Sequence, residues 1–135
     1  MRMDDLKVDV TKLEDGAWVS DIPEMGGLRL KTRGIGNKQW RKMQARLNAA
    51  TPRNKRDDPD ELERILATLI RETALLDWEG FEGPDGKPLP FSKDQANEYL
   101  TNPEYDRKFF NAAVYAASVV AEKNKAAIEE DAKNS

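Results

Sequence analysis

The feature that most constrains the fold of this chain is a regular spacing of core-type residues after Asp58 and Pro59. Asp58 suits a helix N-cap, Pro59 suits the first helical position, and Glu61 stands three residues after the cap. Residues that can face a core then recur at steps of three and four: Leu62, Ile65, Leu66, Leu69, Ile70, Thr73 and Leu76. The pattern predicts an amphipathic helix that continues to about Trp78. Burial of five or six such side chains would contribute about 1.5 to 3 kcal/mol each, so this helix needs a hydrophobic core.

The length of 135 residues favours a single domain around that core. We expect one globular domain over residues 1–122, with a flexible start at 1–7 and a mobile linker at 51–57, followed by a flexible tail at 123–135. The absence of Cys excludes disulfides and thiolate metal sites and favours an intracellular protein. The longest stretch without charge, residues 109–121, is shorter than the roughly 17 to 25 residues of a membrane span. The sequence therefore predicts neither export by a visible signal nor insertion in a membrane.

A β-hairpin is predicted before the central helix. Residues 17–22 and 28–33 flank a turn-rich segment, and a further short strand is expected at residues 8–13. The second hairpin strand alternates with period two, so Leu28, Leu30 and Thr32 should be buried. The opposite face, which carries Arg29, Lys31 and Arg33, should meet solvent or a partner.

A basic helix is predicted next, over residues 38–50 with Asn37 as its cap. Trp40, Met43 and Leu47 fall on one stripe, while Lys38, Arg41, Lys42 and Arg46 occupy most of the remaining surface. Residues 29–56 hold ten Lys or Arg and no Asp or Glu. This basic block is either a solvated surface or a site for a partner of opposite charge.

The last third of the chain predicts an aromatic-anchored loop and two helices. Trp78, Phe81 and Phe91 should anchor a loop that turns at residues 84–86. Ser92 should cap a short helix, and Asn102 with Pro103 should start a longer one that is apolar on nearly every side. Such a helix is either central or covered by a partner. The predicted fold class is α+β, mostly α, with an N-terminal β-hairpin or small antiparallel sheet followed by about four helices around one core.

Catalysis finds little support in these residues. The chain has no His and no Cys, which excludes the commonest general base, thiol nucleophiles and His-dependent zinc sites. The acidic residues around Asp58 suit the start of a helix, where the dipole favours negative charge. We therefore expect no catalytic residue, no cofactor and no metal.

The ordered set of elements between residues 16 and 122 resembles the tail assembly chaperones of long-tailed, siphovirus-like bacteriophages and prophages. The most specific part is the unit at 78–96, in which a helix ends in Trp78-Glu79-Gly80 and a loop leads to Pro90-Phe91-Ser92 and Ala96. The resemblance implies a non-enzymatic factor that binds the tape measure protein and helps to recruit tail tube subunits. It would act in the host bacterial cytoplasm and be absent from the mature virion. Such families often also make a longer, frameshifted product, which would be a further partner.

Two sets of residues are candidates for partner binding: the cations of the basic block and the apolar residues outside the main stripe of the last helix, namely Arg29, Lys31, Arg33, Lys38, Arg41, Lys42, Arg46, Phe110, Val114 and Val119. The apolar residues have an alternative, which is to pack against the hairpin. The cations have two alternative roles. They could join copies of the chain, or they could bind nucleic acid through residues 29–56 if the chain is a nucleic-acid-associated packaging or regulatory protein. Nucleic acid is the less favoured partner because the sequence pI is about 5.1 and Trp40 lies on the apolar stripe.

Overall fold

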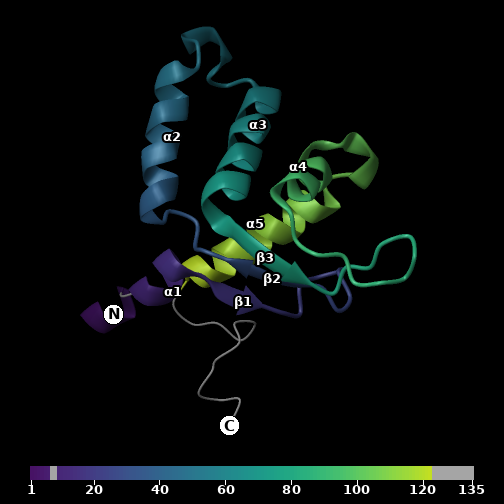
Figure 1. Cartoon of the computed structure of the whole chain (residues 1–135). Coiled ribbons are helices and arrows are strands. Elements are labelled where there is room, and N and C mark those ends of the chain that lie inside the picture. The colour runs from purple at the N-terminus through teal and green to yellow at the C-terminus, as the bar shows by residue number, and fades with distance from the viewer. Residues whose placement is uncertain (7–8, 123–135) are drawn as a thin grey trace.

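The computed structural model describes residues 1–6 and 9–122 of the chain and has an α+β, mostly helical fold, as predicted (Figure 1). Its helices and strands follow in the order α1 (Val10–Asp15), β1 (Ala17–Val19), β2 (Arg29–Thr32), α2 (Lys38–Ala50), α3 (Pro59–Leu69), β3 (Leu75–Glu79), α4 (Lys93–Thr101) and α5 (Lys108–Ala121). Short 3-10 helices lie at Met3–Leu6, Arg53–Lys55 and Pro103–Tyr105, and a π-helical turn at Ile70–Ala74. No helix among the described residues is both long and apolar enough to cross a membrane.

The three strands form one antiparallel sheet in the order β1-β2-β3. The predicted hairpin is confirmed, with Val19 opposite Leu30 and Ala17 opposite Thr32. Leu28, Leu30 and Thr32 are buried, as the alternation predicted.

The expected length of the central helix was wrong. Asp58 caps α3 by accepting a hydrogen bond from the backbone N–H of Asp60, but the helix gives way to the π-helical turn and then to β3. β3 supplies a second neighbour for β2, whose backbone groups would otherwise lie at a free sheet edge. Leu76 is thus in a strand, and Leu62, expected in the core, is 49% exposed.

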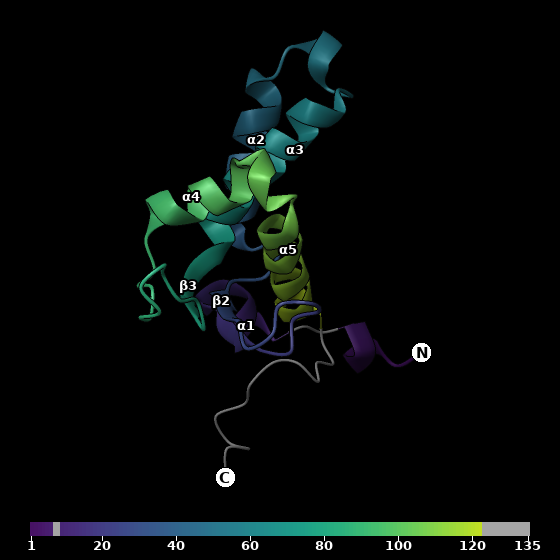
Figure 2. The same ribbon diagram turned by 90° about the vertical axis from the view of Figure 1, so that its right-hand side faces the viewer.

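Helix α5 packs across one face of the sheet and forms the centre of the core (Figures 1 and 2). Ala112, Ala113, Ala116 and Ala117 are buried and let its backbone come close to its neighbours, so that the Ile35 N–H donates to the Ala117 carbonyl at 3.1 Å. Phe110 and Val119 are also buried, and Val114 is half-buried. The apolar circumference of this helix is therefore used mainly for packing within the domain.

Helices α2 and α3 form an antiparallel pair that projects from the sheet (Figure 1). Trp40 is buried at its base, whereas Met43 and Leu47 are half-buried. Asn37 joins this pair to the core: its Oδ1 accepts from the Trp40 N–H at 2.9 Å, and its Nδ2 donates to the carbonyls of Gly34 at 2.9 Å and Thr73 at 3.0 Å.

Two further local expectations were wrong. Residues 10–13 of the expected first strand belong to helix α1, because Asp9 caps that helix by accepting from the Lys12 N–H at 3.2 Å; Val8 lies outside the described residues. Pro103 starts only a single 3-10 turn, and α5 begins at Lys108, because Asp106 and Arg107 adopt left-handed conformations that interrupt the helix.

The predicted linker is exposed from Pro52 onward and contains the 3-10 helix Arg53–Lys55, while Thr51 is buried. The expected mobility of residues 1–7 and 51–57 stays a prediction. The expected flexible tail at 123–135 lies outside the described residues.

Candidate functional site

Two of the three basic residues on the β2 side, Arg29 and Arg33, have side-chain partners within the described part of the fold. Arg29 forms an ion pair with Glu79 and lies over the ring of Trp18, with 4.8 Å between its guanidinium carbon and the ring centroid. Lys31 lies opposite Asp77 of β3. Arg33 donates from Nε to the carbonyl of Glu14 at 2.8 Å. The unpredicted strand β3 thus supplies the carboxylate that pairs with Arg29 and places Asp77 opposite Lys31, whereas Arg33 is bound by the backbone of α1.

The basic residues of α2 are differently placed. Lys38, Arg41, Lys42 and Arg46 are exposed, and none of these side chains forms an ion pair within residues 1–6 and 9–122. The backbone N–H of Lys38 donates to the carboxylate of Glu14, which supports the start of the helix. The outer face of α2 is therefore a positively charged surface, as predicted.

The predicted loop anchors meet around Trp78. Its ring contacts Phe81 at 5.1 Å and Phe91 at 4.8 Å between centroids, both in edge-to-face geometry. Tyr99 and Phe109 complete the cluster at 5.7 and 5.8 Å. The indole N–H donates to the carbonyl of Leu89 at 2.9 Å, and Leu89 in turn donates its N–H to Phe81 at 2.9 Å. The loop is thereby held against the sheet and α4.

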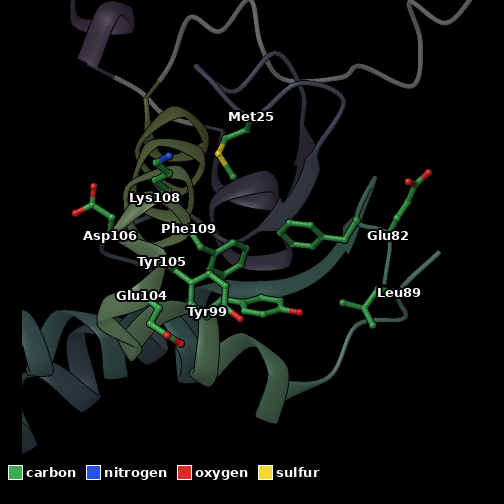
Figure 3. A pocket seen from close by; sticks show the side chains of 10 residues that line it. Met25, Glu82, Leu89, Tyr99, Glu104, Tyr105, Asp106, Lys108 and Phe109 are labelled. Carbon is green, nitrogen blue, oxygen red and sulfur yellow. The ribbon is translucent and has the colours of Figure 1, made fainter. Parts of the chain in front are cut away.

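An aromatic groove opens beside this cluster, between the β1–β2 loop, the loop before α4, and the junction of α4 and α5 (Figure 3). Its volume is about 440 Å³, and it is lined by Met25, Phe81, Glu82, Leu89, Tyr99, Glu104, Tyr105, Asp106, Lys108 and Phe109. Tyr99 links its aromatic residues, with ring centroids 5.6 Å from Phe81, 5.0 Å from Tyr105 and 5.8 Å from Phe109. Tyr105 is 39% exposed and so presents an aromatic surface to any occupant.

A second hollow of about 420 Å³ continues the groove along α5. The two hollows share Met25, Asp106 and Lys108, and the second adds Ile22, Pro23, Glu24, Asn111, Ala112 and Tyr115. The two hollows adjoin through these shared residues and together form one depression, whose first part is mainly aromatic and whose second part is more polar.

The rim of this depression is acidic. Among the described residues that line it are Glu24, Glu82, Glu104 and Asp106 and one cation, Lys108, so these residues carry a net charge of −3. Burial raises the pKa of the Tyr99 phenol, with smaller contributions in the same direction from Tyr105 and Glu98, so this hydroxyl is neutral at pH 7.

Backbone strain is concentrated along the same depression. Four residues other than glycine have positive φ in the described part of the chain: Asp21 and Glu24 in the β1–β2 loop, and Asp106 and Arg107 before α5. Both segments border the depression. Left-handed backbone in non-glycine residues costs free energy and often marks a binding site. Arg107 is held in place by an ion pair with Glu63 at 2.8 Å.

Sequence reasoning missed this groove. It expected one long helix from Asn102 and Pro103 onward, and it gave no role to Met25 or Asp106. No short-range signal predicts the groove, because its lining comes from three segments that are separate in the sequence: the β1–β2 loop, the loop before α4 and the junction of α4 and α5. The same reasoning selected Phe110 and Val119 as candidates for partner binding, but both side chains are buried in the core.

Comparison with models of protein families identifies the family of the chain. A family model described as YdaY prophage protein matches residues 35–134. The chain belongs to the YdaY prophage protein family. No curated protein and no solved structure matches it. The part of this YdaY chain that the family model covers includes the basic helix α2 and the α4 and α5 side of the groove, but not the β1–β2 loop that supplies Met25.

Proposed function

We propose that this YdaY family member is a non-enzymatic tail assembly chaperone, which binds the tape measure protein and helps to recruit tail tube subunits in the cytoplasm of the host bacterium. Its family supports a prophage role, and the unit at residues 78–96 supports the finer assignment through its resemblance to such chaperones. The observation that carries the proposal is the aromatic groove.

The groove suits a helix-rich client better than a small metabolite. Its apolar lining comes from large side chains that are only partly covered, among them Phe81, Tyr99 and Tyr105. An amphipathic helix would cover these side chains and hide its own apolar face at the same time. Covering a client in this way requires no catalytic group.

A second candidate is a nucleic-acid-associated packaging or regulatory protein. It is favoured by the exposed cations of α2, which lack ion-pair partners among the described residues and could contact phosphates. The face offers no aromatic platform for bases, because Trp40 is buried. We therefore rank this candidate below the chaperone.

The test is co-purification of the chain with a tape measure protein encoded by the same prophage, at low and high salt and with unrelated DNA as a competitor. Apolar contacts weaken little as salt rises, whereas phosphate contacts weaken steeply. We expect a complex that survives high salt and ignores DNA. A chain that releases the tape measure protein and instead binds DNA in a salt-sensitive manner would favour the second candidate.

A further inference from the structure

We infer that the aromatic groove receives a cationic amphipathic segment, that is, a stretch of another protein that places large apolar side chains in the groove and Lys or Arg beside them. The identity of that other protein rests on the proposed function, which names the tape measure protein. The inference adds the chemistry of the segment that binds.

The apolar part of the segment is set by the floor of the groove. Phe109 is buried beneath it, and Met25 points into it between the β1–β2 loop and α5 (Figure 3). A volume of about 440 Å³ lies within the usual range of about 300 to 1,000 Å³ for sites that bury a ligand. A segment without a large apolar side chain would leave this floor in contact with water.

The charge of the segment is set by the rim. Glu82, Glu104 and Asp106 lie on different sides of the opening (Figure 3). None of these three carboxylates forms an ion pair or a side-chain hydrogen bond within residues 1–6 and 9–122, whereas Glu61, Glu63, Glu72 and Glu79 are paired. The rim therefore holds unsatisfied negative charge next to an apolar wall, where attraction to a cation is stronger than in bulk water.

The aromatic residues of the groove also favour a positively charged segment. The faces of the Tyr99, Tyr105 and Phe81 rings are electron-rich and attract Lys or Arg groups that lie over them. Two such contacts lie within the described part of the chain, with Arg29 over Trp18 at 4.8 Å and Arg107 over Phe110 at 5.4 Å.

A second copy of the chain, bound through α2, is a poorer occupant. The exposed face of α2 offers Lys38, Arg41, Lys42 and Arg46 but no large apolar side chain, since Trp40 is buried and Met43 and Leu47 are half-buried against the rest of the fold. It would match the rim and leave the floor uncovered. The occupant is therefore a segment of a different protein that carries both features.

The experiment measures fluorescence anisotropy of two labelled amphipathic helical peptides added to the full chain. Both peptides carry the same leucine and phenylalanine face, and they differ only in having Lys or Glu on the other face. We expect the Lys peptide to bind at least about tenfold more tightly than the Glu peptide. In the Glu82→Gln/Glu104→Gln variant this preference should fall about tenfold. In the Tyr105→Ser variant the affinity for both peptides should fall.

The matched control is Asp15→Asn/Asp57→Asn, which changes the net charge equally at exposed positions outside the groove. It should retain the preference for the Lys peptide, and thermal unfolding verifies that each variant is folded. Equal binding of both peptides, or an equal effect of both double variants, would overturn the inference. If the tape measure protein still co-purified in that case, the proposed function would stand without the inference. If the Lys peptide bound as expected but the tape measure protein did not co-purify, the groove chemistry would stand and the proposed client would fall.

Discussion

Replacement of Trp78 with Ala is expected to lower the free energy of unfolding by about 3 to 5 kcal/mol. The side chain is 3% exposed and contacts four aromatic rings, from the loop before α4 and from α4 and α5. Its loss would leave a cavity at the point where these elements meet the sheet, and it would also remove the hydrogen bond to the Leu89 carbonyl.

Urea unfolding of the two proteins measures this effect, and Trp18→Ala is the matched control. Trp18 is half-buried on the sheet face away from α5 and contacts the Arg29 guanidinium, so its removal creates no core cavity and should cost much less. Equal losses of stability in the two variants would contradict the view that Trp78 organises this side of the molecule.

Replacement of Asn37 with Ala is expected to cost about 2 to 4 kcal/mol, although it removes only three side-chain heavy atoms beyond Cβ. The residue is fully buried, and its amide makes three hydrogen bonds that join α2, the strand-to-helix turn at Gly34, and Thr73. Each buried group left without a partner costs about 1 to 3 kcal/mol, and loss of an N-cap costs about 1 kcal/mol.

Asn37→Asp separates these contributions. An aspartate keeps the acceptor for the Trp40 N–H but cannot donate to the Gly34 and Thr73 carbonyls, so we expect it to recover little of the lost stability. Asn48→Ala, on the exposed part of the same helix, should be nearly neutral. Thermal unfolding measures all three, and a fully stable Asn37→Asp protein would show that the cap alone matters.

The sequence predicted correctly those features that depend only on neighbouring residues, such as helix caps and the alternation of a strand. Asn37, Asp58 and Ser92 cap helices as expected, because a cap depends on residues within one turn. The alternation around Leu30 likewise fixed the buried face of β2. β3 was missed because residues 75–79 continue a helical spacing, and only the free edge of β2 draws them into the sheet.

The site was harder to predict than the fold, for the same reason. The contact of Trp78 with Phe81 and Phe91 follows from a short loop, and it was predicted. The groove depends on Met25, Phe81 and Tyr105 meeting across the fold, and on left-handed backbone at Asp106 that the sequence does not signal. The ion pair of Arg29 with Glu79 was not predicted either, because it depends on strand β3 lying beside β2.

The central claim is that the client sits in the aromatic groove and not on the basic helix. The most direct measurement is retention of the tape measure protein by Tyr105→Ser and by Arg41→Gln/Lys42→Gln, two sets of exposed positions whose change should leave the fold intact. We predict that the groove variant loses the tape measure protein at high salt and that the α2 variant retains it. Loss in the α2 variant together with full retention in Tyr105→Ser would contradict the account and move the binding surface to α2.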